Sequence, residues 1–181
     1  PGSNGMVRTT IDLIRAERKA GINAQFVDWG GAEAYGQHYS RAGLTLDGVT
    51  TVGLEWARDA DILFVHSSIP PQLAKLNKPT VLAMHGRPEY SFELERNKRG
   101  SCLNLYHDFN SRPNTIGFVT FWPEHVQVWG KMLNRGIEYV PAMVDLDFFN
   151  PSGEEYKFQE DNMFNIILAD VWREDVTPFG C

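Results

Sequence analysis

The stretch DILFVH at positions 61–66 decides the fold of this chain. Its apolar residues run without a break, which is typical of a strand that is buried on both faces of a parallel sheet. Two runs of the same kind follow, PTVLAM at 79–84 and TIGFVTF at 115–121. Because parallel strands are joined by long crossover connections, usually helices, we expect a helix between each pair of these strands.

Helical patterns occupy the intervals as expected. Proline is tolerated in a first helical turn, so Pro70 and Pro71 predict a short helix that ends near Leu76. Apolar spacing predicts further helices at 7–20, 89–99, 100–108 and 123–135, and further strands at 24–29, 138–140 and 164–169. This alternation predicts an α/β fold, a Rossmann-like doubly wound parallel sheet with helices on both faces.

The segment VPAMVDLDFFNP at 140–151 interrupts this regular pattern. Pro141 and Pro151 fix the backbone and remove hydrogen-bond donors, so the segment is expected to be an irregular connector. Its apolar side chains predict that it packs, as a junction between domains does. We therefore expect a first domain at 1–150, a linker at 151–163 and the start of a second domain at 164–181. Both ends look cut, so the chain is expected to be a fragment of a longer protein.

Composition narrows the class of protein. Of the 181 residues, 43% are hydrophobic, which favours a globular core over disorder, and the net charge of −6 argues against a nucleic-acid partner. No apolar run approaches the roughly 20 residues that a transmembrane helix needs. Cys102 and Cys181 are too few and too far apart for a disulfide framework or a metal site. These features predict a protein without a transmembrane segment in the reducing cytoplasm.

The connector at 140–151 resembles the segment that joins the two domains of GT-B glycosyltransferases, especially retaining family 4 (glycosyl transferases group 1), where a short strand leads into a Pro…Val-Asp…Phe…Pro run. The order of the strands, the His85-Gly86 pair at a strand end and the strand and helix at 115–135 agree with this resemblance. It implies carbohydrate biosynthesis by transfer of a sugar, of hexosyltransferase type, from a nucleotide-diphosphate donor to a hydroxyl acceptor.

The resemblance also implies which ligands are needed and which domain binds each of them. No metal and no other cofactor would be needed, and the acceptor would be a glycan, a lipid-linked molecule or a small molecule. Residues 1–150 would form the acceptor-side domain, and 164–181 would begin a truncated donor-side domain. This fragment by itself would be inactive.

The first candidate site follows the strand at 79–84. Ligands of open parallel sheets bind beyond the carboxyl ends of the strands. His85 at such an end, next to Gly86, can hydrogen-bond a sugar hydroxyl or a phosphate oxygen, and the Arg87 guanidinium suits an anion. A histidine bonded to local backbone and a solvated arginine explain these residues equally well. The resemblance makes His85 the catalytic candidate, facing the donor sugar.

Four other residues, Asn4, Gly5, Glu124 and Arg173, are candidates for substrate or donor binding. Asn4 and Gly5 precede a helix whose N-terminus suits phosphate, although a simple turn and cap also explains them. Glu124 matches an acidic residue of the family, although its place in a first helical turn also suits the helix dipole. Arg173 matches an arginine that grips the donor diphosphate, but Glu174 and its neighbours stand where the family has a lysine. Trp122 suits either stacking on a sugar ring or the core.

Two alternative functions stay open. One is a non-catalytic sugar- or nucleotide-binding domain of the same fold, and the other is a sugar-nucleotide epimerase, which needs carboxylates in its cleft. The remaining histidines, including His38, His66 and His107, share no spacing with acidic partners and receive no role.

Overall fold

A computed structural model describes residues 5–27, 29–30, 39–40, 42–46, 48–66, 69, 71–96, 102–141 and 152. The predicted connector, apart from its first two residues, and the predicted strand at 164–169 lie outside these ranges. Asn4 and Arg173 lie outside them as well.

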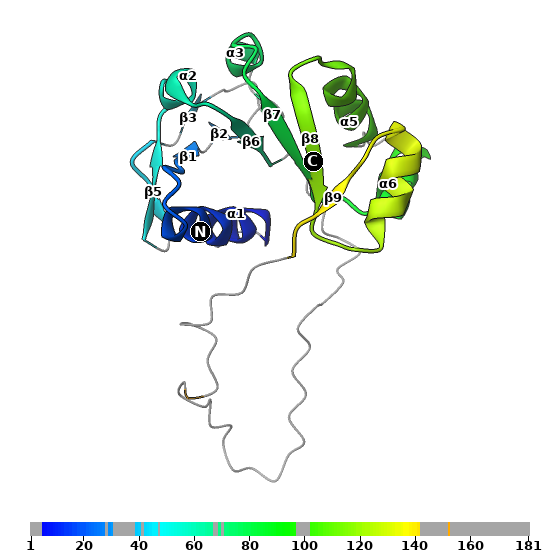
Figure 1. Ribbon diagram of the computed structural model, residues 1–181, viewed down its shortest axis with the longest axis horizontal. Helices are drawn as coiled ribbons and strands as arrows, with labels where there is room; N and C mark the ends of the chain where they lie inside the picture. The colour runs from blue at the N-terminus through cyan, green and yellow to red at the C-terminus, as the bar shows by residue number, and fades with distance from the viewer. Residues whose placement is uncertain are drawn as a thin grey trace. The chain divides into compact units, whose positions relative to one another are not determined.

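The centre of the fold is a four-stranded parallel sheet. Its strands are β6 (Leu63–Val65), β7 (Thr80–Met84), β8 (Thr115–Thr120) and β9 (Glu138–Tyr139), and they lie side by side in that order (Figure 1). Every neighbouring pair is parallel. The sheet therefore confirms the α/β class and the parallel pairing predicted from the buried apolar runs.

Helices connect these strands as the sequence predicts. The short helix α3 (Pro71–Ala74) precedes β7, α4 (Pro88–Arg96) and α5 (Cys102–Ser111) join β7 to β8, and α6 (His125–Leu133) precedes β9 (Figure 1). Asn134 follows helix α6 as its C-cap, adopts the left-handed conformation and donates its backbone N–H to the Gly130 carbonyl. Asparagine tolerates this conformation better than most residues, so it suits the position. None of the helices in the described ranges has both the length and the apolar character of a membrane span.

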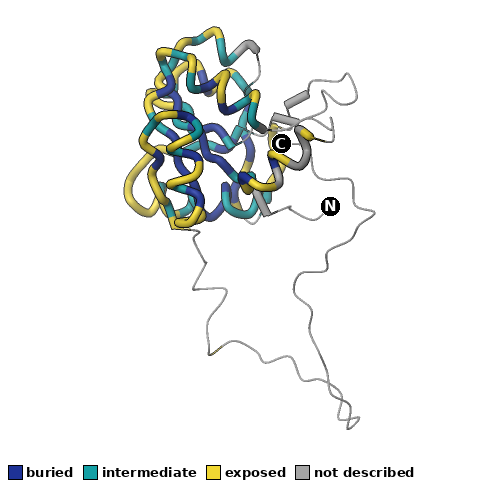
Figure 2. The backbone as a smooth tube through the Cα atoms, turned by 90° about the vertical axis from the view of Figure 1, so that its right-hand side faces the viewer, coloured by how far each residue is buried: buried dark blue, intermediate teal, exposed yellow. Residues whose placement is uncertain are grey.

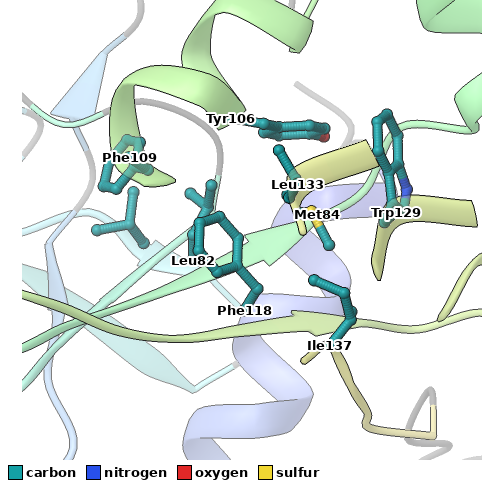
Figure 3. Close-up of a cluster of buried hydrophobic side chains, with 9 residues drawn as sticks. Leu82, Met84, Tyr106, Phe109, Phe118, Trp129, Leu133 and Ile137 are labelled. Atoms are coloured by element: carbon teal, nitrogen blue, oxygen red, sulfur yellow. The ribbon is translucent and has the colours of Figure 1, made fainter. Parts of the chain in front are cut away.

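The largest core cluster lies between the sheet and helices α5 and α6. Strand residues Leu82, Met84 and Phe118 meet Tyr106, Phe109, Trp129, Leu133 and Ile137, as Figure 3 shows. The rings of Tyr106 and Trp129 are perpendicular, with centroids 5.0 Å apart, a geometry that aromatic pairs favour. Buried segments, dark blue in Figure 2, run through the middle of the described part of the chain.

Side chains of the other sheet face form a second buried cluster. Ala83, Val119 and Phe121 alternate along the chain with residues of the first cluster, and Phe64 packs against them. Both faces of the sheet are therefore apolar, which explains why its strands read as continuous apolar runs rather than as alternating ones.

The residues before β6 build a smaller assembly. Helix α1 (Gly5–Lys19) places Ile11 and Ile14 against Phe26 and Val49. Strand β1 (Phe26–Val27) pairs in parallel with β5 (Val49–Val52). On the other side of β5, β4 (Thr45–Leu46) pairs with it in antiparallel orientation. Strands β2 (Trp29–Gly30) and β3 (Tyr39–Ser40) form a separate antiparallel pair. The short helix α2 (Trp56–Asp59) follows.

The antiparallel pairs depart from the predicted all-parallel arrangement. Leu46 pairs with Val49, so only two residues separate the paired ends of β4 and β5. The second of these, Gly48, has φ of 76°, which glycine adopts without steric cost. A two-residue turn of this kind joins antiparallel strands and leaves no room for a crossover helix.

Candidate functional site at the strand ends

Three rings meet at the carboxyl edge of the parallel sheet. His66, His85 and Phe121 each come directly after a strand, namely β6, β7 and β8. Ring centroids lie 5.2 Å apart for the two histidines, 4.8 Å apart for His85 and Phe121, and 6.3 Å apart for His66 and Phe121. We call these three residues the strand-end cluster. Its position is the one at which open parallel sheets bind ligands.

A hydrogen bond joins the two histidines of the cluster. The distance from His66 Nδ1 to His85 Nε2 is 2.9 Å, so one ring donates an N–H and the other accepts it. Phe64 also contacts His66, with ring centroids 5.0 Å apart. The imidazole pair is thus partly buried among aromatic rings.

This apolar setting keeps both imidazoles uncharged near neutral pH. Burial, together with the smaller effect of the neighbouring His85, lowers the pKa of His66 to about 3. Burial also lowers the pKa of His85 to about 4. A neutral imidazole offers one N–H donor and one lone pair. The pair is therefore suited to hydrogen bonding and not to holding a permanent positive charge.

A hydrogen bond links the loop that contains His85 to the hydrophobic core. The backbone N–H of Gly86 donates to the hydroxyl of Tyr106 in α5 over 3.4 Å, and Tyr106 is only 2% exposed. Burial raises the pKa of Tyr106 to about 12, so its phenol stays protonated. Because Tyr106 packs on Trp129, the peptide next to His85 is tied to the packing of α5 and α6.

The other predicted site residues occupy the same loops or helix ends. Arg87 is exposed, and its carbonyl accepts the N–H of Ser91 in the first turn of α4. Glu124 is exposed at the N-cap of α6, where it makes no side-chain capping bond. Gly5 is the first residue of α1. The structure thus places His85, Gly86 and Arg87 in one loop after β7, and Glu124 after the neighbouring β8.

Trp122 belongs to the surface and not to the core. Its side chain is 42% exposed, whereas the adjacent Phe121 is 5% exposed. Of the two interpretations open from the sequence, the exposure excludes core packing and leaves stacking on a ligand possible.

His66 is the site residue that sequence reasoning missed. Its spacing from acidic residues matches no motif shared with the other histidines, so that pattern assigns it no role. The overlooked signal is positional: His66 follows the buried strand at 61–66 just as His85 follows the strand at 79–84. Neighbouring parallel strands end at one edge, so two such histidines can meet.

The described residues contain no group of three or more histidine, cysteine or acidic side chains placed to hold a metal ion. Within those residues the two imidazoles also form no ion pair or hydrogen bond with a carboxylate. The chemistry that this arrangement supports best is recognition of an uncharged polar group.

Fold and site together define an α/β protein with a parallel sheet and a neutral histidine pair at its carboxyl edge. Comparison of the chain with protein-family models, with curated protein sequences and with solved structures finds no match.

Proposed function

We propose that this chain is the acceptor-side domain of a GT-B glycosyltransferase that resembles retaining family 4. Such an enzyme moves a sugar from a nucleotide-diphosphate donor to a hydroxyl acceptor. The observation that carries the proposal is the place and state of His85, which follows β7 at the carboxyl edge and is held neutral beside His66. A sugar hydroxyl both donates and accepts hydrogen bonds, which matches a neutral imidazole.

Exposed side chains around this edge supply the other contacts that a nucleotide sugar needs. Trp122 follows Phe121 of the strand-end cluster in sequence, and its exposed indole suits the face of a sugar ring. Arg87 is exposed beside His85, and its guanidinium suits a phosphate or carboxylate. Glu124 follows the next strand and would contact the acceptor.

In this proposal the donor diphosphate contacts other parts of the chain. Gly5, the first residue of α1, and Asn4, which precedes it in sequence, would offer backbone N–H groups, and Arg173 would offer its guanidinium, as the family resemblance implies. Such fixed donors stabilise a leaving diphosphate electrostatically. The catalytic task of His85 is then to hold the transferred sugar by a hydroxyl.

One observation favours a second candidate, a non-catalytic sugar- or nucleotide-binding domain. The pKa values of His66 and His85, about 3 and about 4, make both imidazoles weak bases. Weak bases bind hydroxyls well and remove protons poorly. A sugar-nucleotide epimerase has less support, because the histidine pair makes no contact with a carboxylate among the described residues.

The test uses the complete protein that contains this chain. Thermal shift is measured with UDP, GDP, UDP-glucose and GDP-mannose, because a ligand of the folded state raises the unfolding temperature by mass action. Sugar transfer is followed as release of the nucleoside diphosphate. We expect one nucleotide sugar to stabilise the protein and to be turned over.

Two alanine variants, one at the proposed site and one away from it, complete the turnover test. His85→Ala is expected to abolish turnover while the protein stays folded, and His107→Ala, the same change at an exposed position of α5, is expected to leave turnover unchanged. Stabilisation without turnover in the wild type would select the binding domain. No stabilisation by any of the four ligands would contradict the glycosyltransferase and leave the non-catalytic domain as a binder of sugar without a nucleotide.

A further inference from the structure

The bond between His66 and His85 leaves one nitrogen of each ring unused. Nδ1 of His66 and Nε2 of His85 bond to each other, so His66 Nε2 and His85 Nδ1 remain. Within the described part of the chain, neither of these two nitrogens has a protein hydrogen-bond partner. A nitrogen that is partly buried among rings and has no partner gains from bonding a ligand.

The shared bond forces the two rings into the same tautomer. If His66 Nδ1 carries the proton and donates, then His85 Nε2 is a lone pair and His85 Nδ1 carries the proton. If His85 Nε2 donates instead, His66 Nδ1 is a lone pair and His66 Nε2 carries the proton. In both cases the pair presents one N–H and one lone pair through its two unused nitrogens.

We propose that His66 is a positioning residue that sets the tautomer of His85, so that the two rings act as one unit and take the hydroxyl groups of a sugar ring rather than a phosphate. This inference deepens the proposed function and rests on it for the identity of the ligand. The coupling of the two rings does not depend on any enzyme activity.

The match between hydrogen-bond donors and acceptors explains why the histidine pair should prefer sugar hydroxyls to phosphate. Neighbouring hydroxyls of a sugar can offer one donor and one acceptor, which matches the pair in either shared tautomer. Phosphate oxygens only accept, so one of them would face a lone pair unless the pair took up a proton. Among the described residues, the rings of Phe64 and Phe121 contact the imidazoles, and apolar surroundings disfavour a charged imidazole.

A purely structural role would not require the His66 nitrogens. The His66 ring is stacked on Phe121, with 12° between the ring planes, and contacts Phe64. A phenylalanine at position 66 would fill the same space without a polar atom that needs a partner. The specific contribution of histidine here is the hydrogen bond to His85.

Two substitutions distinguish the contribution of the aromatic ring of His66 from the contribution of its Nδ1 atom. His66→Phe keeps the aromatic ring and removes the bond, whereas His66→Asn places an amide near the position of Nδ1 and can still bond His85 Nε2. We expect His66→Phe to weaken binding of UDP-glucose or GDP-mannose, whichever the wild type binds, about 5- to 10-fold. Binding of free UDP or GDP should stay within about twofold, and His66→Asn should restore part of the lost affinity.

Three outcomes of these affinity measurements would contradict the proposal. Unchanged binding of the nucleotide sugar by His66→Phe overturns the proposal, and so does an equal loss for the sugar nucleotide and the free diphosphate. A His66→Asn variant as weak as His66→Phe also overturns it, because then the bond to His85 does not matter.

A spectroscopic readout keeps the test independent of the proposed function. Nitrogen NMR of the imidazoles in the ligand-free wild type should show His66 and His85 in the same tautomer, and His66→Phe should release His85 into a mixture. Different tautomers in the wild type overturn the inference even in an active glycosyltransferase. Matched tautomers in a protein that binds no nucleotide sugar overturn instead the proposed function and the sugar as ligand.

Discussion

His66 and His85 are 19 residues apart in sequence, yet their ring nitrogens lie 2.9 Å apart at the ends of two neighbouring parallel strands. Each imidazole satisfies one polar atom of the other in surroundings that are otherwise aromatic. The pair therefore affects two properties that are measured separately, the stability of the fold and the recognition of a ligand.

The histidine pair should make stability depend on pH. The folded pKa values, about 3 and about 4, lie below the ordinary value of 6.5, so between these limits the unfolded chain binds protons that the folded chain does not. Stability is fully present above about pH 7 and falls as the pH drops toward 4, by about 2 kcal/mol for each ring at pH 5. Urea unfolding at pH 7.5, 6 and 5 measures this loss.

The double variant His66→Phe with His85→Phe is the control for that measurement. It lacks both titrating rings, so its stability should change much less between pH 7.5 and pH 5. An equally steep loss in this variant would show that other groups cause the pH dependence.

The core next to β8 should be sensitive to truncation at one position and tolerant at a nearby one. Phe118 is fully buried against α5 and α6, so Phe118→Ala should cost about 3–5 kcal/mol through lost contacts and a cavity. Ile116 lies on the same strand but is 55% exposed, and Ile116→Thr should stay within about 0.5 kcal/mol. Denaturant unfolding compares the two, and similar losses would contradict the described burial.

Two glycines should respond in opposite directions to alanine. Gly117 lies inside β8, where an added Cβ would meet Val81 side-chain atoms at 3.7 and 3.9 Å, which is ordinary contact. Gly117→Ala should stabilise the protein by about 0.5–1 kcal/mol. Gly48 has φ of 76°, so Gly48→Ala should destabilise it by about 1–2 kcal/mol.

Melting temperatures of the two alanine variants are sufficient to check this pair. If both change in the same direction, the conformation described for one of the two glycines is wrong.

The Tyr106 hydroxyl should contribute to the loop that carries His85. Tyr106→Phe keeps the ring against Trp129 and leaves the Gly86 N–H without its acceptor. Because the bond is long, we expect a loss of stability of no more than about 1 kcal/mol. Amide hydrogen exchange at Gly86 should become faster, while Tyr139→Phe, at a tyrosine that is 46% exposed, should leave it unchanged.

Much of the fold follows from local patterns in the sequence. The runs at 61–66, 79–84 and 115–121 predict the three longer strands of the parallel sheet, and the helices α4, α5 and α6 lie where apolar spacing places them. These predictions succeed because a buried strand and an amphipathic helix each leave a mark within a few neighbouring residues.

The hairpin of β4 and β5 was predictable but was missed. Asp47 and Gly48 form an Asp-Gly pair between two short runs that are rich in threonine and valine or leucine, a strong signal for a two-residue hairpin turn. The segment is short and lies in sequence with little periodicity, so apolar spacing alone does not predict a pair of strands there.

By itself, the sequence determined which segments become strands and helices and that His85 ends a buried strand, because these properties depend on residues close together in the chain. Only the tertiary structure decided that His66 is its partner. The two histidines meet because β6 and β7 pair in parallel, with Val65 opposite Leu82. Phe121, directly after β8, adds an apolar ring that contacts both imidazoles. Pairing of strands and desolvation of a side chain depend on residues distant in sequence, so they arise only when the chain folds.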